Sequence, residues 1–86
     1  MAKLMAVAVM DRAVGAFHRP FFTVSVGQAM RGFEDECKRV ADDNPMSKHP
    51  KDFALFQLGS YDEETGRLES LDIPLKLCEA TDFGGL

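Results

Sequence analysis

Phenyl rings interleaved with basic groups are the feature of this sequence best suited to chemistry. They fall within six consecutive positions: Phe17, His18, Arg19, Phe21 and Phe22. No acidic residue occurs between Arg12 and Phe33. Aromatic rings beside guanidinium groups can stack on unpaired bases, which contributes about 1–3 kcal/mol per base. The alternative is that the three rings belong to the core and that the arginines are simply solvated.

The predicted contact with a base is Phe22. Neighbouring side chains of an extended segment point to opposite sides, so at most one of Phe21 and Phe22 is expected beneath a covering helix. A second basic cluster, Lys48-His49-Pro50-Lys51, could hold phosphates by charge, although nearby aspartates weaken it and a solvated loop is the alternative. The candidate nucleic-acid-binding residues are Arg12, Arg19, Phe22, Arg31, Lys48 and Lys51.

Catalysis and metal binding are not predicted. Cys37, Cys78, His18 and His49 have the composition of a zinc site but share no local spacing. The acidic run 62–64 lacks the twelve-residue spacing of a calcium loop, and the sequence has neither a glycine-rich phosphate loop nor a nucleophile elbow. The protein is therefore expected to be no enzyme and to have no cofactor, with both cysteines free in a reducing compartment.

The charge of the chain is acidic overall but unevenly distributed. With 86 residues it is expected to form one domain, residues 1–86, with a formal net charge of −4. Residues 1–31 carry four basic side chains against one aspartate, whereas residues 32–86 carry six basic and thirteen acidic ones. The net charge argues against a dedicated nucleic-acid binder. The apolar run 4–10 is too short to span a membrane, and no membrane association is expected.

The elements that must position these groups follow from local patterns. The run 4–10 predicts a buried strand, and residues 11–15 predict a turn in which Gly15 can take positive φ. Residues 17–24 are expected to be extended. Ser25 is a plausible N-cap of a helix over residues 25–41. One face of that helix carries Val26, Met30, Phe33, Cys37 and Val40. Residues 53–72 predict a hairpin whose turn has Gly66 in the left-handed region.

These elements predict an α+β fold of order β-α-β-β, a three-stranded sheet with one covering helix. If the first strand is parallel to the second, the helix must form a right-handed crossover. Pro74 is expected to end the last strand, and Gly32 to mark a close approach of helix and sheet. The uncovered face or a sheet edge is a candidate self-association surface, and a homodimer is expected.

Four segments of the chain resemble a known family. They are MAKLMAVAVMDRAVGAF, RPFFTVSVGQAMRGFEDE, HPKDFALFQLGSYDEETGRL at residues 49–68, and PLKLCEA at residues 74–80. In this order they resemble the small nonstructural protein of gokushoviruses, which are single-stranded DNA microviruses. The resemblance covers nearly the whole chain, and the hairpin motif is its most specific part. Phe53 departs from it, since Tyr is common there.

The resemblance implies a bacteriophage protein of the host bacterial cytoplasm that binds DNA during genome replication or packaging. Together with the acid-free stretch, it favours weak, salt-sensitive binding of single-stranded DNA without sequence preference. The alternative is a non-catalytic interaction module that binds a phage or host protein through an open sheet face or edge. The acidic net charge favours this alternative.

Overall fold

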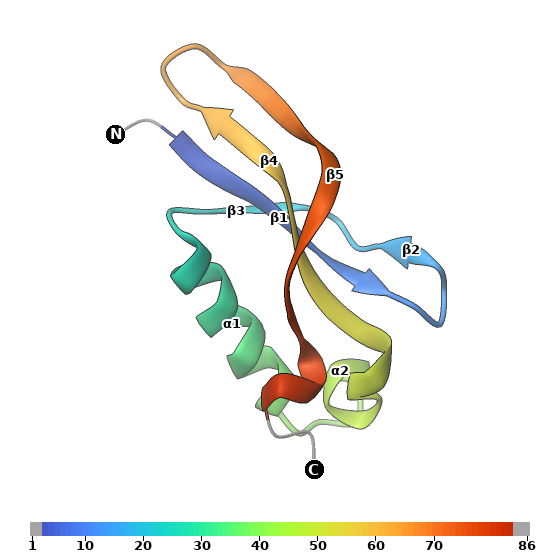
Figure 1. Cartoon of the computed structure of the whole chain (residues 1–86). Coiled ribbons are helices and arrows are strands. Elements are labelled where there is room, and N and C mark those ends of the chain that lie inside the picture. Colours follow the sequence, from blue (N-terminus) through green and yellow to red (C-terminus); the bar gives the residue numbers. More distant parts are fainter. Residues whose placement is uncertain (1–2, 84–86) are drawn as a thin grey trace.

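The computed structural model describes residues 3–83 as a curled antiparallel sheet with one main helix along one side (Figure 1). The strands are β1 (Lys3–Asp11), β2 (Ala16–Phe17), β3 (Phe21–Thr23), β4 (Phe53–Asp62) and β5 (Arg67–Glu79). The helices are α1 (Val26–Lys38) and α2 (Pro45–Lys48), with short 3-10 turns η1 (Pro50–Asp52) and η2 (Ala80–Phe83). The predicted α+β class is confirmed.

The predicted three-stranded β-α-β-β topology is wrong. The sheet has the order β2-β1-β4-β5, β3 also pairs with β1, and every pairing is antiparallel. The reason lies in the turn after β1, which sends the chain back along β1 as β2 and β3. Thr23 therefore lies opposite Met5, near the start of β1, and α1 carries the chain to the other end, where Phe53 lies opposite Asp11. The crossover that a parallel pairing would need does not arise.

Helix α1 is capped at both ends by side chains. At the N-terminus the Ser25 hydroxyl accepts a hydrogen bond from the Gln28 N–H at 3.1 Å, as predicted, and the Gln28 side chain accepts one from the Val24 N–H at 2.8 Å. At the C-terminus the buried Asn44 amide donates to the carbonyls of Glu36 and Arg39, each at 2.7 Å. The helix ends at Lys38 rather than at residue 41 as predicted, because Asn44 satisfies its last carbonyls.

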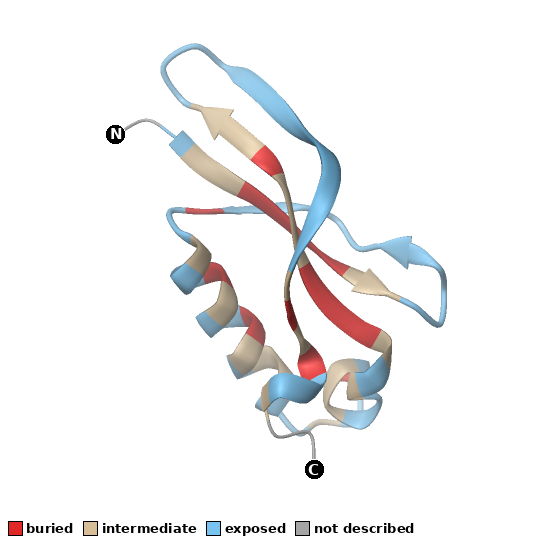
Figure 2. Ribbon diagram, in the orientation of Figure 1, coloured by how far each residue is buried: buried red, intermediate tan, exposed pale blue. Residues whose placement is uncertain are grey.

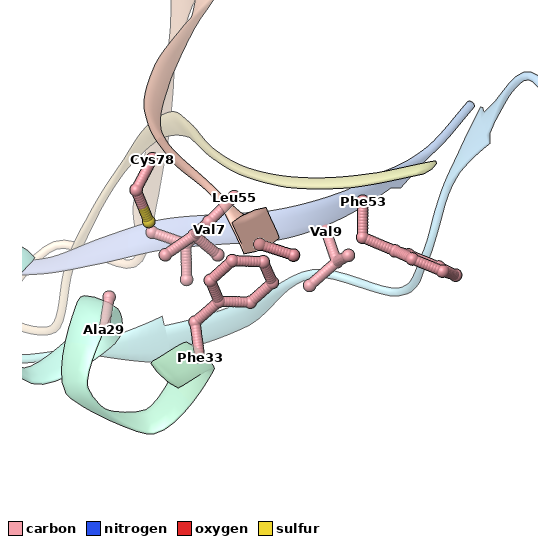
Figure 3. Packing of buried hydrophobic residues seen from close by; sticks show 8 residues of the cluster. Val7, Val9, Ala29, Phe33, Phe53, Leu55 and Cys78 are labelled. Atoms are coloured by element: carbon pink, nitrogen blue, oxygen red, sulfur yellow. The ribbon is translucent and has the colours of Figure 1, made fainter. Parts of the chain in front are cut away.

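The core lies between α1 and the face of the sheet that carries Val7 and Val9. Figure 3 shows these valines packing with side chains from the helix and from β4 and β5, namely Ala29, Phe33, Phe53, Leu55 and Cys78. Val40 was expected on the same helix face but lies beyond the helix end and is 91% exposed. Figure 2 shows buried residues in the interior of the sheet and along one side of α1.

The turns predicted at Gly15 and Gly66 are confirmed, whereas the predictions made for Gly32 and Pro74 are wrong. Gly15 and Gly66 both have positive φ, at 81° and 74°. Gly32 is exposed, and apart from its own turn of the helix a methyl group there would meet no atom of the described chain within 4 Å. The close approach occurs instead at Gly59, where a Cβ would overlap the carbonyl of Glu69.

Strand β5 continues through Pro74 to Glu79, although Pro74 was expected to end it. The pairing with β4 shifts register here, since Gly59 lies opposite Ser70 but Gln57 lies opposite Leu75. Within residues 3–83, no partner in β4 is paired in register with residues 71–74. Proline is tolerated at such an irregularity because its missing N–H removes no ladder hydrogen bond.

Candidate nucleic-acid interface

The face of the sheet opposite α1 carries four aromatic rings. Because directly opposed residues of antiparallel strands point to the same side, the pairing register places each ring with an even-numbered residue of β1. The register pairs are Leu4 with Tyr61, Ala6 with Phe22, Ala8 with Phe56 and Met10 with Phe17. We call this surface, formed by Phe17, Phe22, Phe56 and Tyr61, the aromatic face.

The four rings form two pairs. The ring centroids of Phe17 and Phe56 are 5.4 Å apart with an interplanar angle of 87°, and those of Phe22 and Tyr61 are 5.6 Å apart at 52°. These edge-to-face and tilted geometries are favourable for aromatic side chains. The rings explain why Ala8 is fully buried although α1 lies on the other side of the sheet.

The outer ring of each pair remains accessible. Phe17 is 40% exposed and Phe22 is 47% exposed, so the alternative that placed these rings in the core is wrong. Phe21 is 41% exposed and lies opposite Val7, which places it on the α1 side of the sheet. Phe21 and Phe22 therefore point to opposite sides, as expected, and neither is buried beneath the helix.

A shallow groove of about 240 Å³ adjoins the ring of Phe22. Its lining residues are Ala6, Pro20, Phe22, Leu58, Gly59, Ser60, Leu68, Glu69 and Ser70. The groove exists because Ala6 and Gly59 lie opposite each other in the pairing and have almost no side chain. Its volume is below the range of sites for drug-sized ligands, so it suits a single flat or aliphatic group.

Three charged side chains gather at the other end of the aromatic face. Arg12 donates to both carboxylate oxygens of Glu79, with an Nη1–Oε1 distance of 2.9 Å. The Lys76 ammonium donates to Glu79 Oε2 at 2.8 Å. Lys76 lies opposite Phe56 in the register, so this trio borders the Phe17–Phe56 pair. Two cations share one carboxylate, which leaves a formal charge of +1.

The trio has a consistent protonation state. The hydrogen bond from Arg12, followed by the one from Lys76, lowers the pKa of Glu79 to about 2. The same hydrogen bond raises the pKa of the Arg12 guanidinium. Glu79 therefore stays ionised at any physiological pH. The Asp52 carboxylate also attracts the Arg12 guanidinium, so the charge of +1 is that of the trio alone.

The predicted basic residues fall into two groups. Arg12 lies beside Lys51, since its guanidinium also donates to the Lys51 carbonyl at 2.9 Å, and Arg19 lines a hollow with Phe17. Arg31 lies on α1, and Lys48 in α2 donates to the Asp42 carbonyl at 2.8 Å. The fold thus brings Arg12, Arg19 and Lys51 toward one part of the molecule, whereas Arg31 and Lys48 belong to the helical layer.

The family model for "Phage ORF5 protein" matches residues 4–83 of this chain. The chain belongs to this phage protein family. Membership in a family of small phage proteins, expected from the four segments quoted above, is thereby confirmed. No curated protein and no solved structure gives a significant match.

The resemblance to other phage proteins left three residues of the interface unnamed. Phe56 and Tyr61 were read only as parts of a strand, and Lys76 lay beyond the predicted hairpin. The two rings complete the aromatic face in this family member, and Lys76 borders it. Strand alternation offered a signal for Phe56, because its neighbours Phe53 and Leu55 form the apolar face of β4. The irregularity at Leu58 reverses that alternation before Tyr61, so no such signal existed there.

Three further observations concern the free thiols, the possible metal ligands and the helices of the chain. Burial raises the pKa of both free thiols, Cys37 and Cys78, to about 11, so the reactive thiolate form is disfavoured. Among residues 3–83, three or more His, Cys, Asp or Glu side chains nowhere gather in a metal-binding arrangement. In the same described part of the chain, the helices lack the length and apolarity needed to cross a bilayer.

Proposed function

We propose that this phage protein is a non-catalytic accessory protein that binds single-stranded DNA through its aromatic face. Binding is independent of sequence and serves genome replication or packaging of a microvirus in the cytoplasm of the bacterial host. The observation that supports this most is the pair of accessible rings, Phe17 and Phe22, on one sheet face that is bordered by the positively charged trio.

The rings provide the contact with bases. Aromatic side chains on an exposed sheet face are a recurrent platform for unpaired bases, which can be splayed out and stacked. Phe17 rests against Phe56 and Phe22 against Tyr61, so each accessible ring is already held in place. Little side-chain entropy is then lost when a base stacks. Every base has a π-face, so this contact carries no sequence preference.

The charge distribution permits this binding despite the acidic net charge. Five of the fourteen acidic residues lie in α1 and the loop after it, on the other side of the sheet. There Lys38 pairs with Glu34 at 2.7 Å, and Arg39 pairs with Glu36 at 2.7 Å. Arg12, Arg19 and Lys76 border the aromatic face and can contact phosphates. Glu79 shares the charge of Arg12 and Lys76, so this trio adds one net positive charge to that of Arg19. About two contacts give a slope of log affinity against log salt of about −1.4 for a single strand.

Fluorescence anisotropy of a labelled oligothymidine, measured at low and at moderate salt, tests the proposal. We expect Phe17→Ala and Phe22→Ala each to weaken binding about five- to a hundred-fold, which corresponds to the loss of one stacked base. Phe21→Ala is the matched control, because Phe21 has similar exposure but lies on the α1 side. No binding of the unchanged protein at low salt would end the proposal.

The groove beside Phe22 supports a second candidate function. Its lining is mostly apolar, which also suits an aliphatic side chain of a phage or host protein. In that case Leu68→Ser and Phe22→Ala would abolish capture of a specific partner from infected cells, and an excess of oligonucleotide would not compete with it. DNA competition for the partner would favour the nucleic-acid function instead.

A further inference from the structure

The aromatic face contains the same arrangement twice along β1. In each ring pair, the accessible ring lies opposite one residue of β1, and its partner in β4 lies opposite the residue two positions earlier in β1. The register positions are Met10 for Phe17, Ala8 for Phe56, Ala6 for Phe22 and Leu4 for Tyr61. The Phe22–Tyr61 pair therefore repeats the Phe17–Phe56 pair after four residues of β1, which corresponds to about 13 Å along the strand.

Two irregularities bring the rings into this repeat. Phe17 and Phe22 are five positions apart in the sequence, and so are their partners in β4, whereas the matching stretches of β1 span four. In a regular strand, an odd separation would place two side chains on opposite faces of the sheet. The extra residue is accommodated in β4 at Leu58, where the register with β1 shifts, and on the other side of β1 by residues 18–20, which lie between β2 and β3. Both rings of the second pair are thereby returned to the face of the first.

We propose that one DNA strand lies along β1 and stacks one base on Phe17 and another on Phe22, so that two bases that are not neighbours are held at the same time. This arrangement rests on the proposed function and defines how much of a strand one protein molecule covers. A strand with the B-form rise of about 3.4 Å per nucleotide needs about four steps to cover this distance, and a strand with splayed bases needs fewer. The two stacked bases are therefore separated by about one to three intervening nucleotides.

A repeat of this kind fits a linear polymer with repeating units. Once the first base has stacked, the second contact is intramolecular, and it adds affinity only if the strand between the two bases spans the two rings. The groove of about 240 Å³ beside Phe22 leaves room for the intervening nucleotides, because Gly59 stands between Phe56 and Tyr61 on this face without a side chain. A single aliphatic side chain of a protein would occupy one ring and leave the other free.

The positive groups of the interface lie beside the Phe17–Phe56 pair. Lys76 lies opposite Phe56, and Arg19 lines a hollow with Phe17. The charged residue that lines the groove beside Phe22 is Glu69, an anion. The strand is therefore held by charge and stacking at one pair and by stacking at the other. Because stacking releases no counterions, we expect the gain from the second base to persist at moderate salt while the overall affinity falls.

Oligonucleotides that carry two thymines in an otherwise abasic strand test the spacing. All have the same length of about twelve nucleotides, within the range of known single-strand binding sites, and the thymines are adjacent or separated by an increasing number of abasic positions. We expect the affinity, measured by fluorescence anisotropy, to peak at about one to three abasic positions, about five-fold or more above the strand with adjacent thymines. A strand with one thymine should bind within about two-fold of the strand with adjacent thymines, since each places one base on a ring.

Variants of the rings show whether the peak arises from both of them. Phe17→Leu and Phe22→Leu should each abolish the peak, because leucine keeps an apolar contact with the partner ring but offers no aromatic plane. Phe21→Leu should keep the peak, because Phe21 lies on the α1 side of the sheet.

The outcomes separate this inference from the proposed function. An affinity that does not change with spacing, while an all-thymine strand binds more tightly than an all-abasic one, would overturn the simultaneous stacking on two rings and leave the proposed function in place. A peak that survives Phe22→Leu would overturn it as well. Equal binding of the all-thymine and all-abasic strands would overturn both.

Discussion

Arg12 donates two hydrogen bonds to the carboxylate of Glu79, which joins the turn after β1 to the end of β5. The two residues are 67 positions apart in the chain. The Arg12 guanidinium could donate to a phosphate, but its Nη1 and Nη2 groups already donate to the Glu79 carboxylate. This contact therefore links the stability of the sheet to the affinity of the proposed interface for DNA.

Removing the carboxylate should strengthen DNA binding. In Glu79→Gln the amide still accepts a hydrogen bond, but Arg12 and Lys76 no longer have their anion and become free to contact phosphates. We expect the affinity for oligothymidine at low salt to rise several-fold, with a salt slope steeper by about 0.7 for each added contact. Anisotropy titrations over a range of salt concentrations measure both values.

Glu64→Gln is the charge-matched control for this substitution. Glu64 is exposed in the turn between β4 and β5, away from Arg12. It changes the net charge equally, so the two variants differ only in where the carboxylate is lost. Equal gains in affinity would show that the trio at Glu79 has no special part in binding.

The same contact should make stability depend on pH in the acid range. The pKa of Glu79 is lowered from 4.5 to about 2 in the folded protein, so the folded state favours the carboxylate. Its contribution is complete above the unfolded pKa and is lost as the pH falls from about 4.5 toward 2. Because solvent screens the 42% exposed Arg12 side chain, we expect about 1 kcal/mol.

Urea unfolding at several pH values checks this dependence. Glu79→Gln should be less stable than the unchanged protein at pH 6, and the two should converge near pH 2. Glu64→Gln should show no such convergence. A constant difference between the unchanged protein and Glu79→Gln across this range would mean that the ion pair does not contribute to folding.

The buried Asn44 should be a major determinant of stability in the helical layer. Its amide donates to two carbonyls at the end of α1, and its side-chain oxygen accepts from the Met46 N–H at 3.1 Å. Asn44→Ala leaves buried polar groups without partners, and we expect a loss of about 2 kcal/mol in the free energy of unfolding. Asp43→Ala, at an exposed neighbour, should change it by less than about 0.5 kcal/mol.

Two glycine-to-alanine substitutions should have opposite effects. In Gly59→Ala the new methyl group would overlap the Glu69 carbonyl, so β4 and β5 must separate, and we expect a loss of about 2 kcal/mol or more. In Gly32→Ala the methyl group points into open space on α1, and the higher helix propensity should add about 1 kcal/mol. Thermal unfolding of both variants measures the effects, and a stable Gly59→Ala protein would contradict the close approach of the strands.

Local patterns in the sequence were sufficient for much of the fold. The first strand, the N-cap at Ser25 and the turns at Gly15 and Gly66 each depend on a few neighbouring residues, and all four were predicted correctly. The C-terminal end of α1 was not, because Asn44 caps it from outside the helix. A contact of that kind has no periodicity to reveal it.

The sheet order and the candidate site depend on contacts between distant residues. Residues 16–23 pair with β1 because of the turn after β1 and because aromatic rings from several strands cover Ala6 and Ala8. No single segment of the sequence contains this information. Phe21 and Phe22 were predicted correctly to point to opposite sides of the sheet. Tyr61, which contacts Phe22, was not foreseen because it lies beyond the irregularity at Leu58. The resemblance to a phage family supplied a biological setting without this geometry.

Nuclear magnetic resonance of the isotope-labelled protein, titrated with oligothymidine at low salt, tests the central claim most directly. The proposal predicts that shift changes concentrate at Phe17, Phe22, Phe56, Tyr61 and Lys76, while the exposed residues of α1 stay unchanged. Shift changes centred on α1, or none at millimolar oligonucleotide, would contradict the assignment of the aromatic face to DNA.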